Sequence, residues 1–304
     1  MNRLPSISFV RSGFAREFFV AVALLGTGCS DPLTRVDLIA DTRVLGARVE
    51  VDGEPDRASP APGETARVRW LVADPEPAAL LGWAFAICAA APPGGSLPSC
   101  GGEPFATAMA DVPVASEPAI DFTVPIDIES RALAVFGVVC PDSAPRFDGG
   151  EFACSGARGR LVSLDFELET AERTNLNPVI DPGALSLDGE SLPAGTDCAT
   201  LPSVRRSSSH TLELALRETD RDAVSQPTSA DPPKEALQVS HFTTAGKLER
   251  TFTVIEPSEK NLTVKVSWKA PKSVPADGFA RLFFVVRDLR GGADWIERAI
   301  CVTP

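Results

Sequence analysis

The sequence lacks tyrosine and is poor in histidine, and both shortages limit what the protein can do. Its 304 residues include no Tyr and only two His, His210 and His241. Tyrosine is common at protein and carbohydrate recognition surfaces, so its absence disfavours a dedicated surface of that kind. A Ser-His-Asp or Cys-His site needs an imidazole base, which limits such a site to the C-terminal part of the chain.

Neither histidine lies in a catalytic motif. His210 follows the three serines 207–209, and His241 lies in a largely apolar run. The sequence has no nucleophile-elbow pattern, and it offers no carboxylate at a useful spacing to orient either ring. Loop and strand-edge positions are sufficient explanations for both residues. We therefore expect that the protein is not an enzyme and that it has no cofactor.

Motifs for metal, phosphate and nucleic acid are missing as well. No Cys-x-x-Cys pair occurs and neither histidine neighbours a cysteine, which argues against zinc. The glycine pairs have no P-loop lysine and no following helix. The formal net charge is −12, and Arg205-Arg206 is the only short basic cluster, so binding to nucleic acid is disfavoured.

Three carboxylates, Asp165, Glu167 and Glu169, alternate with apolar residues and so share one face of an expected strand. The paired acids of an inverting glycosidase face each other across a cleft, which a row on one strand cannot do. We interpret the row as a solvated face, with a weak calcium or polycation site as the alternative. The turns Asp52-Gly53 and Asp188-Gly189 lack the alternating ligands of a calcium loop, and turn chemistry is sufficient for them.

Short runs of alternating apolar and polar residues are abundant, whereas helical periodicity is not sustained anywhere. Examples are 68–72, 212–216 and 262–268. The 27 Pro and 23 Gly fall mostly between the apolar runs, as turn residues do. The segment Leu133–Cys140 is apolar almost throughout, which is typical of a central strand. The sequence therefore predicts an all-β protein of antiparallel sandwiches.

An internal repeat divides the chain. Segment 49–54 recurs as 185–190, each a strand end running into an Asp-Gly turn, and 135–139 aligns with 282–286 further on. The alternative is that strands of similar composition arose without a common origin. The expected organisation is a signal peptide over 1–28, a tether over 29–42, a first β-sandwich over 43–173, a linker over 174–182 and a second β-sandwich over 183–304.

The chain ends in a predicted β-hairpin, in which Phe283–Arg287 and Trp295–Val302 flank a glycine-containing loop. The residues Val286, Asp288 and Gly291 resemble the Val-x-Asp-x-x-Gly stretch that closes bacterial immunoglobulin-like and PKD-like domains. The resemblance implies an adhesive or spacer fold without catalysis. The expected fold class is thus two tandem immunoglobulin-like antiparallel β-sandwiches after an N-terminal signal segment.

The seven cysteines suit an exported protein, because setting Cys29 aside leaves an even number for disulfides. Spacing favours Cys88 with Cys100, Cys140 with Cys154, and Cys198 with Cys301. The alternative joins Cys88 to Cys140 and Cys100 to Cys154. The offset of the repeat also carries Cys154 onto Cys301, which favours equivalent positions for these two residues.

The four tryptophans are expected mainly in the core. Trp70, Trp83 and Trp268 share a face with neighbouring apolar residues, which favours packing. Trp295 lies beside the loop of the final hairpin. If its ring is exposed, it offers a platform on which sugars stack.

The N-terminal segment reads as an export signal, with arginines before an apolar run at 18–25. Thr27, Gly28 and Cys29 then resemble a bacterial lipobox, although Gly26 stands where an aliphatic residue is usual. The resemblance implies acyl chains such as palmitate on Cys29, anchoring the protein to a lipid bilayer. The alternative is an ordinary signal-peptidase site, with Cys29 incidental.

Together these features resemble the two-domain cell-envelope lipoproteins of unknown function found in myxobacteria and their relatives. We expect an exported, membrane-anchored protein that acts as a non-enzymatic structural or binding module with an envelope protein or glycan as partner. Because Asp31 is one place later than the inner-membrane retention position, the resemblance implies the outer membrane. The alternative is a carbohydrate- or peptidoglycan-binding protein, and a more distant one is a carboxylate-dependent hydrolase.

Overall fold

The computed structural model describes residues 35–75, 80–91, 100–114, 117–148, 151–156, 159–170, 174–222 and 234–304. The signal segment and Cys29 lie outside the described residues. The chain divides into two units, Met1–Arg35 and Val36–Pro304, and the second holds every strand described below. In the described part of the chain, no helix has the length and apolar character needed to span a membrane.

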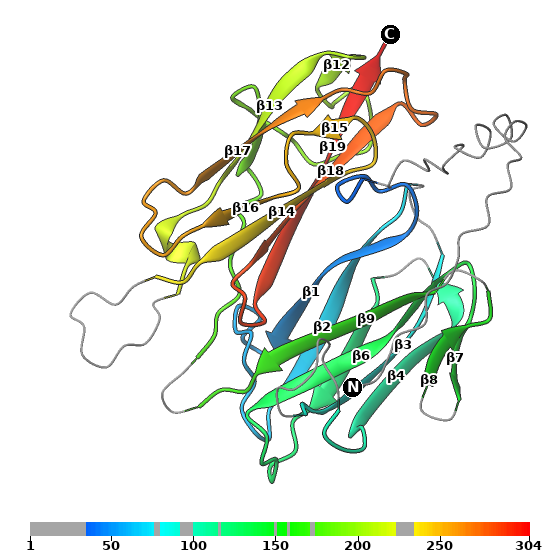
Figure 1. The fold of residues 1–304 in the computed structure, drawn as a ribbon, viewed down its shortest axis with the longest axis vertical. Coiled ribbons are helices and arrows are strands. Elements are labelled where there is room, and N and C mark those ends of the chain that lie inside the picture. The colour runs from blue at the N-terminus through cyan, green and yellow to red at the C-terminus, as the bar shows by residue number, and fades with distance from the viewer. Residues whose placement is uncertain are drawn as a thin grey trace, which may run out of the picture. The chain divides into compact units, whose positions relative to one another are not determined.

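The first half of the second unit forms a β-sandwich (Figure 1). One sheet has the order β1-β2-β5 and the other has the order β4-β3-β6-β9, while β7 and β8 form a separate hairpin beside β3 and β4. The strands are β1 (Arg43–Val51), β2 (Thr65–Ala73), β3 (Leu81–Ala89), β4 (Ala106–Val114), β5 (Ala119–Thr123), β6 (Ala132–Pro141), β7 (Pro145–Asp148), β8 (Glu151–Cys154) and β9 (Arg160–Glu167).

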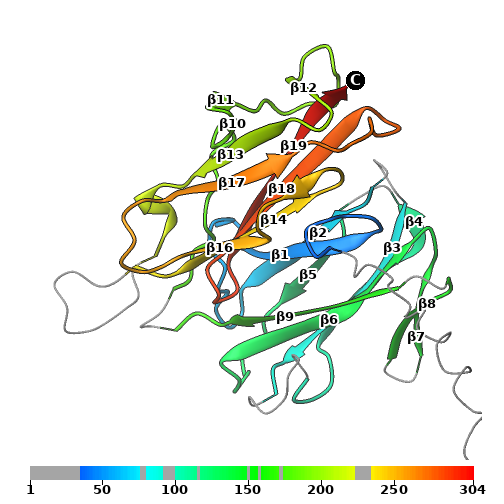
Figure 2. The same cartoon turned by 45° about the horizontal axis from the view of Figure 1, so that its top comes forward.

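The second half forms another sandwich, with sheet orders β11-β10-β13-β17-β15 and β12-β19-β18-β14-β16. Its strands are β10 (Leu185–Leu187), β11 (Glu190–Ser191), β12 (Ser203–Arg205), β13 (Ser209–Ala215), β14 (Leu237–Thr243), β15 (Lys247–Leu248), β16 (Phe252–Ile255), β17 (Thr263–Lys269), β18 (Phe279–Arg287) and β19 (Ala293–Thr303), with one 3-10 turn at Glu218–Asp220. One pair departs from the antiparallel expectation, because the short β12 lies parallel to the end of β19 (Figure 2).

Both sandwiches have immunoglobulin-like strand order. In the first, β1, β2 and β5 form one sheet, and in the second the corresponding strands β10, β13 and β17 form one sheet, to which the short β11 and β15 are added. The repeat in the sequence matches this order, since β1 and β10 are the first strands and β6 and β18 occupy the same place in the facing sheets. The expectation that Cys154 and Cys301 occupy equivalent positions is wrong. Cys154 lies on β8, in the extra hairpin of the first sandwich, whereas Cys301 lies on β19.

Alternation of apolar and polar residues positions the strands in their sheets. On β17, Val264, Val266 and Trp268 are buried while the residues between them are exposed, and β6 is apolar and largely buried as a central strand. One apolar core draws its residues from 44–168 and the other from 180–302. The expected domain boundaries at 173 and 183 are compatible with these two cores and stay a prediction.

Part of the expected tether at 29–42 is packed against the second sandwich. Ile39 is fully buried, and its amide donates to the carbonyl of Thr243 at 2.9 Å. The Thr243 amide in turn donates to the carbonyl of Asp37 at 2.9 Å. These ladder-like bonds fix the chain to the end of β14 from Asp37 onwards.

Candidate functional site

Three disulfides brace the two sandwiches, in the pairing that spacing favours. Cys88 joins Cys100, Cys140 joins Cys154, and Cys198 joins Cys301. The first two close short loops, and the third joins the segment before β12 to β19. Disulfides persist in oxidising compartments, so their presence supports an extracytoplasmic location.

A shared apolar cluster joins the two sandwiches. Leu45 and Leu71 from the first sandwich pack with Phe283 and Val285 on β18, and all four are buried. The guanidinium of Arg69 lies 4.5 Å from the centre of the Trp295 ring. Burial of apolar surface contributes roughly 25 cal/mol per Å², so this contact stabilises one arrangement of the two sandwiches.

The segment expected as a linker is partly buried and is hydrogen-bonded to both sandwiches. Asn177 donates from Nδ2 to the carbonyl of Val49 at 2.6 Å, and its Oδ1 accepts from the amide of Ala293 at 3.0 Å. Asn175 donates from Nδ2 to Asp288 at 2.7 Å, and its main-chain amide donates to Ser59 at 2.8 Å. Both asparagines are less than 5% exposed. They therefore act as polar links between the sandwiches.

A buried arginine adds ionic contacts across the same junction. Arg48 on β1 lies 2.8 Å from Asp294 and 3.0 Å from Glu50, and it also donates to the carbonyl of Ala293. Desolvation raises the pKa of Asp294 above its ordinary value. An ion pair held in so little water is costly to break by removing one partner, since the other charge is left buried.

The Val-x-Asp-x-x-Gly stretch of the final hairpin also lies at the junction. The Asp288 carboxylate accepts from the amides of Arg290 at 2.7 Å and Gly292 at 2.9 Å, which closes the turn. Gly291 has φ of 114°, and a Cβ built on it falls 2.6 Å from the Cβ of Phe166 on β9. Glycine is therefore required at this position for two reasons: its backbone has a positive φ, and the first sandwich approaches too closely for a side chain.

A second carboxylate network borders this hairpin. Arg290 lies 2.6 Å from Glu235 and 3.1 Å from Asp222, and Asp222 also accepts from the amide of Leu176 at 2.8 Å. Glu235 is 3% exposed, and its burial raises the pKa of its carboxyl to about 7. The junction thus holds a carboxyl group that titrates near neutral pH.

The predicted row of carboxylates divides between two environments. Asp165 and Glu167 are exposed on β9, as expected for a solvated face. Glu169 lies beyond the end of β9, is half-buried, and pairs with the buried Arg57, which also pairs with Glu64 at 2.7 Å. The single-face interpretation is therefore wrong for Glu169, because the strand ends before it and the chain turns toward Arg57.

The tryptophans offer no exposed platform. Trp70 and Trp268 are at most 3% exposed, and Trp83 is half-buried with its ring stacked on Phe85 at 5.1 Å. Trp295 is also half-buried, and Arg69 lies over its ring. Arg69 therefore covers one face of the ring on which a sugar would stack.

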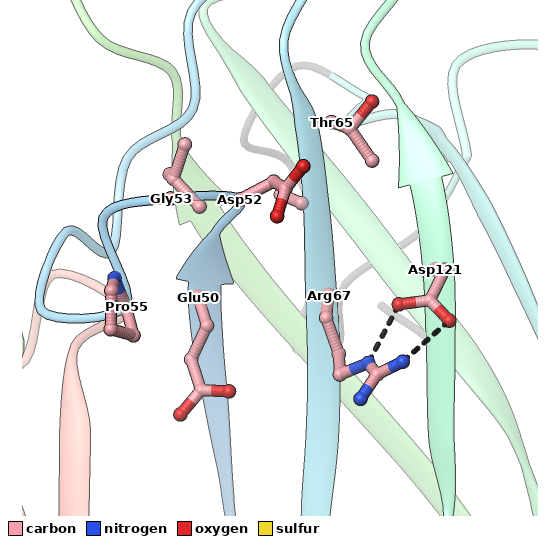
Figure 3. A pocket seen from close by; sticks show the side chains of 9 residues that line it. Glu50, Asp52, Gly53, Pro55, Thr65, Arg67 and Asp121 are labelled. Carbon is pink, nitrogen blue, oxygen red and sulfur yellow. Dashed lines mark hydrogen bonds and ion pairs between the residues drawn. The ribbon is translucent and has the colours of Figure 1, made fainter.

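The pocket shown in Figure 3 lies on β1, β2 and β5 of the first sandwich and has a volume of about 490 Å³. Arg67 forms a two-point ion pair with Asp121 at 2.6 and 2.9 Å, which lowers the pKa of Asp121. Glu50 and Asp52 supply further negative charge, and no aromatic residue lines the pocket. No group of three metal-ligating side chains occurs among the described residues. A largely acidic, non-aromatic pocket does not match a typical small-molecule site.

His210 does have an orienting carboxylate, contrary to the sequence-based expectation. Its Nδ1 lies 2.7 Å from Asp188 and its Nε2 lies 2.7 Å from Ser208 Oγ. Pairing of β10 with β13 brings Asp188 beside Thr211, whose amide donates to the same carboxylate at 2.8 Å. The Asp-Gly turn at the end of β10 was the one local signal in the sequence for this contact, and the register of β10 with β13 supplies the rest.

The order hydroxyl, imidazole, carboxylate is that of a nucleophile triad. However, the Ser208 hydroxyl also lies 2.5 Å from the carbonyl of Arg205, which holds it within its turn. The pocket described above lies on the other sandwich. We interpret the three side chains as a clamp that ties the turn at 188–189 to β13. The second histidine, His241, is fully buried, which lowers its pKa to about 4 and keeps the ring neutral.

Comparisons with known proteins add little. No protein-family profile matches the chain, and no curated protein matches it. Among solved structures, a red sea bream transglutaminase aligns at 14% identity and a TM-score of 0.25 over 86% of this chain. A trypsin-activated alpha-2-macroglobulin from Escherichia coli aligns at 11% identity and a TM-score of 0.24 over 87%. This chain spans 32% and 18% of the lengths of those two chains, and likeness at such scores says nothing of function.

Proposed function

We propose that the protein is an exported, membrane-anchored module of the cell envelope, in which two immunoglobulin-like sandwiches act as one rigid structural or binding body. The observation that carries the proposal is the junction. Its buried asparagines, its ion pairs and its shared apolar cluster are what a fixed arrangement requires, whereas a flexible linker needs none of them. The role is mechanical and does not require a catalytic site.

The proposed membrane anchor is supported by the sequence of the segment that precedes the first sandwich. Cys29 stands in a lipobox-like context, and three disulfides fit an oxidising compartment beyond the inner membrane. Two or three acyl chains on Cys29 give essentially permanent attachment, because each buried methylene contributes roughly 0.8 kcal/mol. The outer membrane is the proposed location.

Mass spectrometry of the mature N-terminus tests the anchor. The expected N-terminal residue is a diacylglyceryl-modified Cys29, and the protein should sediment with membranes. In a Cys29→Ala variant, modification should be lost and the protein should no longer be processed at this site. An unmodified Cys29, or a mature terminus elsewhere in the wild-type protein, contradicts the proposal.

A further inference from the structure

The structure assembles a basic patch that the sequence shows only in part. Arg205, at the end of β12, and Arg206, in the turn that follows it, are both exposed. Lys269, at the end of β17, is the Cα partner of both Ser209 and Lys247, and the side chain of Arg206 reaches the carbonyl of Lys272 at 3.5 Å. The cations of this basic patch are Arg205, Arg206, Lys247, Lys269 and Lys272.

None of these five exposed cations has an ion-pair partner among the described residues, in contrast to their neighbour on β17. Lys265 lies 2.8 Å from Glu213, so its charge is neutralised locally. A positive patch is unusual on a chain with a net charge of −12. The remaining, acidic faces of the protein repel an anionic partner. An anionic partner is therefore drawn to the basic patch.

The basic patch lies next to the place where the chain enters the fold. Asp37 accepts a hydrogen bond from the amide of Leu248 at 3.3 Å, and Leu248 follows Lys247 in β15. The eight residues from Cys29 to Asp37 span at most about 28 Å when extended. An anchor on Cys29 therefore keeps Lys247 and its neighbours within a short distance of the bilayer.

We infer that the basic patch binds anionic phospholipid headgroups and orients the anchored protein on the membrane. The inference rests on the proposed lipid anchor. Each Lys or Arg near an anionic bilayer contributes on the order of 1 kcal/mol, and the attraction falls off within a Debye length of about 8 Å at physiological salt. The anchor holds the body close enough for this short-range term to act. The patch then determines which face of the protein lies against the bilayer.

Lysine acetylation followed by mass spectrometry tests the inference on the lipidated full-length mature protein in nanodiscs. In discs containing phosphatidylglycerol, Lys247, Lys269 and Lys272 should react at least about three-fold more slowly than in phosphatidylcholine discs. Lys260 is exposed in the loop before β17, at the opposite end of that strand, and serves as the internal control with an unchanged rate. The protection should disappear in 0.5 M salt.

A double variant separates charge from simple proximity. Arg205→Gln with Arg206→Gln should remove most of the protection of the three lysines, whereas Arg146→Gln, at an exposed arginine of the first sandwich, should leave it intact. Equal labelling rates in the two kinds of disc overturn the inference while leaving the anchor in place. Failure of the protein to enter nanodiscs at all contradicts the anchor instead, so the two failures are distinguishable.

Discussion

Asn177 shows most directly how a single side chain fixes the two sandwiches. Its amide bonds β1 through Val49 and β19 through Ala293, and it is 3% exposed. A buried polar group that loses its partner costs about 1–3 kcal/mol. In the sequence, Asn177 followed by proline indicates only a break in the strand pattern. The neighbouring residues carry no signal that its side-chain amide has partners on two distant strands.

Replacing Asn177 with alanine should lower the free energy of unfolding by about 2–4 kcal/mol, since donors and acceptors in both sandwiches lose their partner. Urea denaturation measures the change. Asn261→Ala is the matched control, because Asn261 is exposed and its side chain accepts only from the amide of Thr263, two residues away. We expect that variant to change the unfolding free energy by less than about 1 kcal/mol. Equal effects of the two substitutions would show that the junction bonds are not important.

Glu235 should make stability depend on pH. Its folded pKa is about 7 against an ordinary value of 4.5, so the folded state holds the proton more tightly. The free energy of unfolding should therefore fall as pH rises from about 4.5 to about 7, by at most about 3 kcal/mol. In the Glu235→Gln variant, this fall in the free energy of unfolding between about pH 4.5 and 7 should be absent. Denaturation at a series of pH values checks it, and an unchanged slope in the variant contradicts the assignment.

At the scale of elements, period-two patterns were a good guide to the strands. The expected strands at 68–72, 133–140 and 262–268 fall within or largely within β2, β6 and β17, because each hides one or both faces in a core. The final hairpin also forms as predicted. The short loops between paired cysteines made hairpin closures more favourable than bridges across the sheets, and the structure has those pairs.

Contacts between elements were harder to predict, since they depend on how sheets pack and not on local pattern. Glu169 continues the alternation of β9, yet it turns to meet Arg57. Asp188 and His210 lie 22 residues apart and meet only when the register of β10 with β13 is known. The spacing of the two residues in the sequence does not predict the register of β10 with β13, although the Asp-Gly turn reduces the number of registers that are possible.

Gly291 should be the least replaceable residue of the final hairpin. Alanine there adds a Cβ 2.6 Å from Phe166 and keeps a φ of 114°, so we expect a loss of about 3 kcal/mol or more. Gly278 is the matched control, with φ of 80° and nothing within 4 Å of the place that an alanine methyl would take. Gly278→Ala should cost only the backbone strain, about 1–2 kcal/mol. Thermal unfolding compares the two variants, and a smaller loss for Gly291→Ala contradicts the close approach.

At the scale of the whole molecule, we propose one rigid body made of both sandwiches and attached to a membrane anchor. Residues 37–39 lie along β14 of the second sandwich, and the first sandwich packs against β18 and β19. Residues 37–39 therefore bond directly to the second sandwich, and Ile39 also packs in the apolar cluster that the two sandwiches share. In this arrangement a force or a partner acting on one sandwich is transmitted to the other through the buried contacts between them.

Rigidity is the central claim, and ¹⁵N relaxation of the chain from residue 30 onwards tests it most directly. If the two sandwiches form one body, amides in β6 and amides in β17 should report the same overall tumbling time, appropriate to a single particle of the full chain. Asn177→Ala should begin to separate the two values. Distinct and shorter tumbling times for the two sandwiches in the wild-type protein would contradict the account.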